Sequence, residues 1–269
     1  MIDMTDQEFI EISSYIKTNY GVNLDKKRPL IEGRLSNHVS SLGFTTYKDY
    51  FDNVLSDPNK AELSNMVNRL TTNHTFFMRE EDHFAFLEKT ILPWIDKTLG
   101  ERSLRIWSAG CSSGEEPYAL SMTIFDYVKK NPGDWETSIL ASDISSKALL
   151  IGQKGEYLSS ELNSLQDAWM KEYFTNIGED LYKVNSKLRN NVVYKKINLL
   201  DDFDVNKRFH TIFCRNVMIY FDNKTKTKLI EKFYNSLCDG GYLIIGHSET
   251  LSAIENKFNY VSPSIYRKE

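Results

Sequence analysis

The sequence has no long hydrophobic run and few cysteines, and each absence excludes a class of protein. No stretch of about 18 apolar residues occurs, so no transmembrane helix is predicted. The first residues are acidic and lack the basic and then apolar regions of a secretory signal. Cys111, Cys214 and Cys238 lie far apart, which argues against a disulfide framework and against a zinc knuckle. We therefore expect a cytoplasmic protein that does not insert into a membrane.

An excess of positive charge is also missing. The formal net charge is −4, so a general attraction to nucleic acid is not expected. Residues 24–41 are a local exception, because Lys26, Lys27, Arg28 and Arg34 outnumber two acids there. On composition alone, this run fits a solvated helix face as well as it fits a binding surface. The 5 histidines show no H-E-x-x-H or other metal-binding spacing, so the sequence predicts no metal site.

The first hundred residues have the periodicity of helices. Thr5 and Glu8 have the spacing of a capping box at the start of a first helix, and Gly21 is expected to end it. A second helix is predicted to begin near Lys26, with Pro29 tolerated only in its first turn. The predicted helices after the first cover residues 26–42, about 47–57, about 58–70 and 80–99.

From residue 103 onward, short apolar runs alternate with amphipathic segments. This alternation is typical of a parallel sheet covered by helices. Residues 260–266 are expected to add a strand, antiparallel and at or near the edge. Residues 155–190 are too polar for the pattern and are predicted to be an insertion, with a β-like run at 181–184. The predicted strands are 104–107, 138–141, 192–194, 211–214 and 242–245, and the predicted helices are 115–130, 145–153 and 223–238.

A turn rich in small residues follows the first predicted strand and leads into a helix. Its residues are 108–114, and two acids, Glu115 and Glu116, come next. Small residues let a backbone approach a ligand at the carboxyl end of a strand. The turn lacks the G-x-G-x-x-G spacing of a dinucleotide site and the lysine of a phosphate-binding loop. The two acids would repel a pyrophosphate, but they suit the ammonium and sulfonium groups of S-adenosylmethionine. One of them could instead only complement the helix dipole.

Other polar residues follow predicted strands or lie between the two halves of the chain. Asp143 ends the second strand, where nucleotide-binding sheets hold ribose hydroxyls, and it could also cap the next helix. Arg215 and Asn216 follow the fourth strand and are hard to explain as core residues, whereas Asp222 has the position of a helix cap. Residues 73–80 combine polar and aromatic groups and have the composition of an ordinary inter-domain loop.

A hydrolase is an alternative interpretation of the same turn. Residues 110–114 satisfy G-x-S-x-G with Ser112 as nucleophile, and Asp143 or Asp202 and then His247 follow in the chain order of an α/β-hydrolase. This turn would lie on the first strand of the sheet, with no earlier strands beside it. Two acids directly after it would oppose a developing oxyanion. The alternative is therefore the weaker one.

Taken together and in order, the motifs resemble the CheR family of chemoreceptor glutamate methyltransferases. The resemblance rests on N-x-T-x-F-x-R at 73–79, W-S-A-x-x-S-x-G-E-E-P-Y at 107–118, A-S-D at 141–143, N-L at 198–199, C-R-N-V-M-I-Y-F at 214–221 and G-H-S-E at 246–249. It implies an α/β fold: a class I, Rossmann-like methyltransferase sheet with an N-terminal all-helical domain and a small inserted β-subdomain. The implied domains are a receptor-recognition domain at 1–72, a linker and long helix at 73–102, and a methyltransferase domain at 103–269, with its insertion at about 155–190.

The resemblance also implies an activity and a set of site residues. It implies that methyl groups pass from S-adenosylmethionine to glutamates of cytoplasmic receptor helices, leaving S-adenosylhomocysteine. The oligomeric state stays open, and we expect a monomer because nothing in the sequence demands more. Arg79 and Tyr220 would lie beside the transferred methyl, and Lys26, Lys27, Arg28 and Arg34 would face the receptor. The cofactor contacts would be Asn73, Thr75, Arg79, Glu116, Asp143, Asn198, Leu199, Asn216 and Val217.

Two other functional classes stay open at this point. A methyltransferase acting on a small molecule or nucleic acid would keep the cofactor and ignore receptors, although the acidic balance argues against nucleic acid. A non-catalytic module would bind S-adenosylmethionine without turnover. The presence of Asn73, Thr75 and Arg79 together argues against that module.

Overall fold

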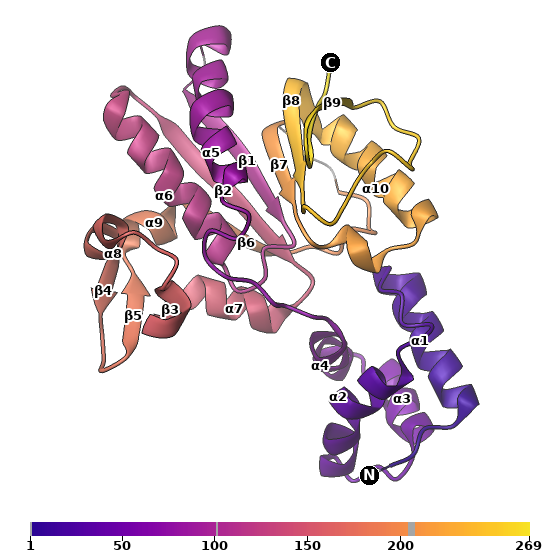
Figure 1. Ribbon diagram of the computed structural model, residues 1–269. Helices are drawn as coiled ribbons and strands as arrows, with labels where there is room; N and C mark the ends of the chain where they lie inside the picture. The colour runs from indigo at the N-terminus through magenta and orange to yellow at the C-terminus, as the bar shows by residue number, and fades with distance from the viewer. Residues whose placement is uncertain (1, 101, 204–207) are drawn as a thin grey trace.

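The computed structural model describes residues 2–100, 102–203 and 208–269. Four helices form the N-terminal part, and they pack around a core of their own, apart from the sheet (Figure 1). Buried members of this core include Ile12, Leu35, Tyr50 and Met66. The helices are α1 (Asp6–Tyr20), α2 (Arg28–Ser41), α3 (Tyr47–Ser56) and α4 (Ala61–Leu70).

The ends of these helices follow from their capping residues. The capping box of Thr5 and Glu8 is present at the start of α1, and Gly21 ends that helix in the left-handed conformation with φ 72°. Helix α2 begins at Arg28, two residues later than expected, with Pro29 in its first turn. The prediction of an all-helical front is confirmed.

The long helix expected over residues 80–99 is shorter and less regular than predicted. It begins at Asp82 because Glu80 has φ 54°, which a helical residue cannot adopt. An α-helical turn, α5 (Asp82–Phe86), is followed by wider π-helical turns at Leu87–Ile91 and Trp94–Leu99. Pro93 lies between the two wide segments and has no N–H to donate, which favours an irregular hydrogen-bond ladder there.

A seven-stranded sheet forms the rest of the molecule, in the order β6-β2-β1-β7-β8-β10-β9. The first five strands in this order run parallel, and β10 runs antiparallel to both β8 and β9. The single strand expected at 260–266 is therefore a hairpin, which turns beside Ser264 at φ 63°. The strands are β1 (Ser103–Ala109), β2 (Glu136–Asp143), β6 (Val192–Lys196), β7 (Phe209–Cys214), β8 (Leu237–Ile245), β9 (Asn259–Ser262) and β10 (Ile265–Arg267).

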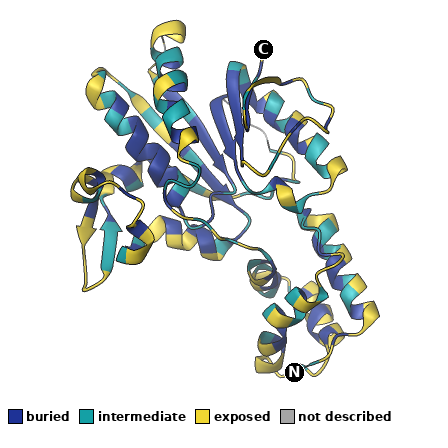
Figure 2. Cartoon of the chain, in the orientation of Figure 1, coloured by how far each residue is buried: buried dark blue, intermediate teal, exposed yellow. Residues whose placement is uncertain are grey.

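Helices cover both faces of the sheet, and successive residues of β1 point into different cores. Ile106 belongs to the core shared with α5 and α6 (Glu115–Lys130), whereas Trp107 belongs to the core shared with α10 (Asn223–Ser236). Figure 2 shows the central strands buried between these layers. Helix α7 (Ser146–Lys154) packs against β2 and β6. Helix α10 ends two residues before the predicted boundary, because β8 already begins at Leu237.

The predicted insertion is a small subdomain that lies beside α6 and α7 (Figure 1). Its antiparallel sheet has the order β3-β5-β4, and the expected β-like run is β5. Its elements are β3 (Glu156–Leu158), a 3-10 turn (Ser159–Leu162), α8 (Asp167–Tyr173), β4 (Phe174–Asn176), β5 (Leu181–Val184) and α9 (Ser186–Asn190). The predicted fold class is confirmed. Among the described residues, no helix combines the length and apolarity needed to cross a bilayer.

Candidate functional site

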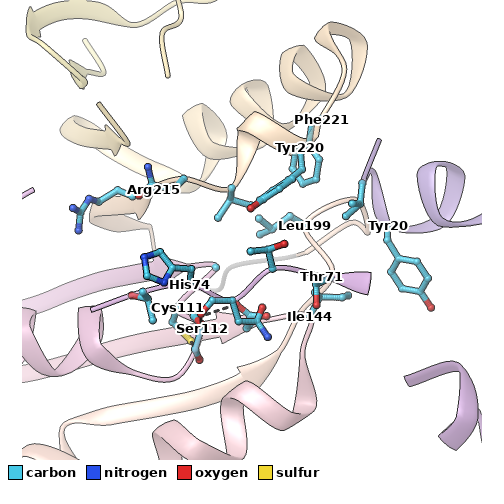
Figure 3. Close-up of a pocket in the computed structure, with 18 of the residues that line it drawn as sticks. Tyr20, Thr71, His74, Cys111, Ser112, Ile144, Leu199, Arg215, Tyr220 and Phe221 are labelled. Atoms are coloured by element: carbon cyan, nitrogen blue, oxygen red, sulfur yellow. Dashed lines mark hydrogen bonds between the residues drawn. The ribbon is translucent and has the colours of Figure 1, made fainter. Parts of the chain in front are cut away.

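A pocket opens at the carboxyl ends of β1, β2 and β7, where the strand order reverses direction around β1 (Figure 3). Open α/β sheets bind their ligands at this position. The N-terminal helices close the pocket from the other side through Tyr20, Val22 and Leu24. The described residues that line it lie at 20–30, 70–79, 84, 110–116, 143–144, 197–199 and 215–221.

The turn after β1 forms the floor of the pocket. The N–H groups of Gly110 and Cys111 both donate to the Ser142 carbonyl, at 2.7 and 2.9 Å. Gly110 has φ 88°, and a Cβ at this position would lie 2.3 Å from Val217 Cγ2. The turn therefore needs glycine here for its backbone angle and for the close approach of the 215–221 loop.

We expect Gly110→Ala to weaken cofactor binding and to lower stability together. The methyl group would push the turn away from Val217 in a backbone conformation that alanine disfavours. Isothermal titration with S-adenosylhomocysteine and thermal unfolding would measure the two effects. Gly43→Ala is the matched control, because Gly43 also has positive φ but has open space around its Cβ position. Equal losses of cofactor affinity and of thermal stability in the two variants would show that the backbone angle alone is responsible.

Asp143 borders the pocket and ties the turn to α7. Its Oδ2 accepts the Ser112 N–H at 2.9 Å, and its Oδ1 accepts the Ser145 N–H at 2.8 Å. Burial raises the pKa of Asp143, although both N–H bonds favour the charged form. Ser145, rather than Asp143, caps α7 by accepting from Ala148 N–H. Asn73 joins this network through its Nδ2, which donates to Ser145 Oγ at 3.2 Å.

A buried guanidinium lies between two carboxylates beside the pocket. The Arg215 side chain is 3% exposed and contacts Glu116 Oε2 at 2.9 Å and Glu80 Oε2 at 3.1 Å. It also donates to the Arg79 carbonyl and lies over the Phe84 ring. Arg215 and Glu116 both line the pocket, so this ion pair fixes the position of the Glu116 carboxylate at the pocket wall.

The two acids that begin α6 have different environments. Glu116 lines the pocket and accepts a hydrogen bond from Ser108 Oγ at 2.6 Å. Glu115 is buried, does not line the pocket and accepts from Ser113 Oγ at 2.9 Å. Burial raises the pKa of Glu115 to about 7. Only Glu116 is therefore placed to act on a ligand.

The segment that carries Arg79 has an unusual backbone. Met78 and Glu80 both have positive φ, at 58° and 54°. Such conformations cost about 1 kcal/mol or more for residues other than glycine and are maintained by surrounding contacts. Arg79 lies between them, half-buried in the pocket wall, and its Nη1 donates to the His74 carbonyl at 3.1 Å.

A partly buried carboxylate that the sequence did not single out as a site residue holds the 215–221 loop. Glu249 accepts the N–H groups of Gly246, Asn216 and Ile219, at 2.7, 2.9 and 3.1 Å. Asn216 has φ 58°, and its side chain donates to Glu80 Oε1 at 3.3 Å. Burial raises the pKa of Glu249. The G-H-S-E motif was the available signal for this residue, but the role depends on a contact across the fold.

The helical front contacts the sheet domain at the rim of the pocket. Asn198 Nδ2 donates to the Asn19 carbonyl at 2.8 Å, and Asn23 N–H donates to the Tyr220 carbonyl at 2.9 Å. Lys27 Nζ lies 5.6 Å from the centre of the Tyr220 ring. The pocket is therefore shared between the two parts of the chain.

The structure brings the predicted cofactor residues together in this pocket. Asn73, Thr75, Arg79, Glu116, Asp143, Asn198, Leu199, Asn216 and Val217 all line it, and so does Tyr220.

The predicted receptor residues are arranged differently from one another. Of the four, only Lys27 lines the pocket. Lys26 is exposed, and Arg28 pairs with Asp6. Arg34 donates to the carbonyls of Arg69, Leu70 and Thr71. Arg34 therefore stabilises the end of α4.

The hydrolase alternative is wrong. Ser112 Oγ donates to the Asn73 carbonyl at 2.9 Å, while His247 contacts Asp82 at 3.1 Å. Asp202 is fully exposed and pairs with Lys232. Among the residues that the structure describes, these groups do not form a serine–histidine–aspartate triad.

Comparisons with known proteins agree on one family. The family model "CheR methyltransferase, all-alpha domain" matches residues 7–71, and "CheR methyltransferase, SAM binding domain" matches residues 73–267. A chemotaxis protein methyltransferase of Borreliella burgdorferi is 39% identical, over 99% of this chain and 96% of that protein. A chemotaxis protein methyltransferase of Escherichia coli is 36% identical, over 98% and 91%. A probable chemotaxis protein methyltransferase of Rhizobium etli is 34% identical, over 94% and 96%.

Proposed function

The chain belongs to the CheR methyltransferase family, and on that premise we propose that it methylates glutamate side chains of chemoreceptors with S-adenosylmethionine. One observation of the structure carries the proposal furthest. The residues of six motifs separated in the sequence meet at one pocket at the carboxyl end of the sheet, or directly behind it.

The residues of the pocket fit S-adenosylmethionine. When bound, this cofactor supplies a methyl group activated by a sulfonium. Glu116 offers a carboxylate to the cationic part, and the small residues of the turn after β1 admit it close to the backbone. Asp143 is placed for ribose hydroxyls, and Asn73, Thr75, Asn198, Leu199, Asn216 and Val217 complete the wall.

The acceptor explains why the site needs no general base. A glutamate carboxylate is ionised at neutral pH and can attack the methyl group directly. A carboxylate and a sulfonium become a neutral ester and a thioether, so excluding water from both ions lowers the barrier. Arg79 orients the incoming carboxylate, and Tyr220 helps position the reacting groups. Both line the pocket, and alignment supplies most of the remaining acceleration.

The helical domain, residues 1–72, presents the positive charge that meets the receptor. Lys26 and Lys27 are exposed at the start of α2, and Lys27 also reaches the pocket rim. They face acidic helices of the receptor's cytoplasmic part, so the enzyme acts in the cytoplasm, and one monomer carries a whole site. Arg28 contributes at the edge of this surface, while Arg34 supports it from within.

The decisive experiment supplies methyl-labelled S-adenosylmethionine and a chemoreceptor cytoplasmic fragment to the purified protein. The expected result is label on the fragment that mild base releases as methanol, which identifies a carboxyl methyl ester. A fragment with its methylatable glutamates changed to alanine should remain unlabelled. Cofactor binding without any label on the receptor would favour a methyltransferase with another acceptor or a non-catalytic binding module.

We expect Lys27→Ala to raise the KM for the receptor fragment about fivefold, equivalent to about 1 kcal/mol, and to leave cofactor affinity nearly unchanged. The difference in KM between Lys27→Ala and wild type should become smaller as salt concentration rises, because ions screen the exposed charge of Lys27. Rate measurements between low and high salt provide the test. Lys89→Ala is the control, because Lys89 is exposed and lies outside the pocket. If KM depended on salt concentration in the same way for Lys27→Ala and for wild type, Lys27 would not take part in receptor binding.

A further inference from the structure

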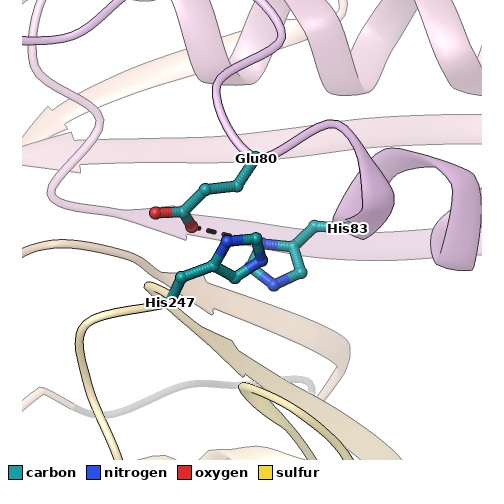
Figure 4. A group of neighbouring side chains, drawn as sticks. All are labelled: Glu80, His83 and His247. Atoms are coloured by element: carbon teal, nitrogen blue, oxygen red, sulfur yellow. Dashed lines mark ion pairs between the residues drawn. The ribbon is translucent and has the colours of Figure 1, made fainter.

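A second group of chemically active side chains lies behind the pocket. Glu80, His83 and His247 each direct one donor atom toward the others, and these atoms all lie within 4.8 Å of one another (Figure 4). Glu80 lies just before α5 and His83 lies in the first turn of that helix, whereas His247 follows β8. The fold, not the sequence spacing, brings them together.

His83 has no hydrogen-bond partner despite its burial. Its side chain is fully buried, and neither Nδ1 nor Nε2 has a partner within hydrogen-bonding geometry. A buried polar group left in this state destabilises the folded protein. Glu80 Oε2 lies 3.5 Å from His83 Nδ1. An ion between these side chains would satisfy the imidazole without disturbing the core around it.

The surrounding groups have the arrangement of a metal second shell. His247 Nε2 contacts Asp82 Oδ2 at 3.1 Å, which orients the ring and leaves Nδ1 for a ligand. Glu80 accepts hydrogen bonds from Arg215 and Asn216, as ligating carboxylates commonly do.

The local charge also favours a cation. Three carboxylates lie near the cluster, those of Glu80, Asp82 and Glu116, against the one guanidinium of Arg215 that bridges Glu80 and Glu116. Arg215 repels a cation, but its charge is shared by these two acids. The carboxylates therefore exceed the guanidinium by two charges.

We propose that Glu80, His83 and His247 bind a divalent transition-metal ion of the zinc class. Two imidazole nitrogens with one carboxylate oxygen suit Zn²⁺ or Co²⁺ and do not suit Mg²⁺ or Ca²⁺, which prefer oxygen ligands. Ligand atoms about 2.1 Å from a tetrahedral ion lie about 3.4 Å apart. The cluster must therefore contract slightly, and His247, with 46% of its side chain exposed, has room to rotate inward.

The ion would connect the segment that carries Arg79 to residues 246–249, where Glu249 holds the 215–221 loop. Because the Arg79 segment and the 215–221 loop both border the pocket, the metal would help to fix their relative position. This role is structural and lies outside the methyl-transfer chemistry. The inference can be tested without measuring methyl transfer.

The test is a titration of the metal-free full chain with Co²⁺, followed by visible absorption, and with Zn²⁺ in competition with a chromogenic chelator. We expect one equivalent to bind, with a d–d spectrum typical of nitrogen and oxygen ligands. His247→Ala and Glu80→Gln should each weaken binding at least about 100-fold, and Asp82→Asn about 10-fold. Zn²⁺ should raise the Tm of the wild type and not that of His247→Ala.

His74→Ala controls for adventitious binding by an exposed histidine. Because His83 is in the core, His247 is the decisive position: its replacement exposes little and should leave the fold intact. Saturable binding at one equivalent that survives in His247→Ala would overturn the proposal, and so would the lack of saturable binding in the wild type.

Discussion

Arg79→Ala is expected to reduce the rate of methyl transfer by at least about 100-fold. Arg79 lines the pocket between two residues with positive φ, and the Arg215 side chain holds its carbonyl. This backbone fixes where the guanidinium can reach. Its loss would remove the group that we propose orients the acceptor carboxylate, and a small misplacement of the attacking oxygen is costly when alignment supplies most of the acceleration.

Initial rates with the receptor fragment, together with cofactor affinity from titration, measure the effect. We expect turnover to fall much further than S-adenosylmethionine affinity, because Arg79 is one of many residues that line the pocket. Arg102→Ala is the matched control, because Arg102 is partly exposed, pairs with Asp96 and lies outside the pocket. Near-normal turnover in Arg79→Ala would refute the orienting role.

Arg215→Met is expected to destabilise the fold by about 3–5 kcal/mol. Methionine keeps an unbranched apolar chain but carries no charge, so Glu80 and Glu116 would remain largely buried without their cation. Burial by itself would raise the pKa of Glu80, and Arg215 with the Asn216 hydrogen bond lowers it overall. The lowered pKa means that this ion pair stabilises the protein above the ordinary pKa of glutamate and loses its effect as the pH falls through the folded-state value.

Urea unfolding at neutral and acidic pH tests this prediction. The gap in the free energy of unfolding between wild type and Arg215→Met should be large at pH 7 and should narrow below about pH 4.5, where glutamates of the unfolded chain become protonated. Arg208→Met is the control, because Arg208 is exposed and its contact with Asp239 is 3.8 Å long. A pH-independent gap would mean that packing around Phe84, not charge pairing, accounts for the loss.

Local patterns predicted those parts of the fold that depend on neighbours in the chain. The Thr5 and Glu8 box, the stop at Gly21 and the cap at Asp222 are interactions within one turn, so their residue types are sufficient. The central strands β1 and β7 of the parallel sheet are buried almost throughout and were visible as apolar runs. The late start of the long helix was not visible, because Glu80 is a good helix former held at positive φ by Arg215 and Asn216.

The site was predictable as a set of residues but not as a network. The resemblance named residues that the structure places together in the pocket. It gave no indication that Glu249 would accept three N–H groups, or that His83 and His247 would meet, because each contact joins distant segments. For Arg34, the resemblance implied a role facing the receptor, and it gave no indication that this side chain would donate to carbonyls at the end of α4.

The shared wall of the pocket limits how this family can be engineered. Tyr20, Val22 and Leu24 belong to the helical front, yet they enclose the same space as the turn after β1. Gly21 also packs against Phe221 so closely that a Cβ there would lie 2.9 Å from the ring. A helical front transplanted from another enzyme to change the choice of acceptor would have to reproduce these contacts. Acceptor choice and cofactor affinity are therefore expected to change together when the two halves are recombined.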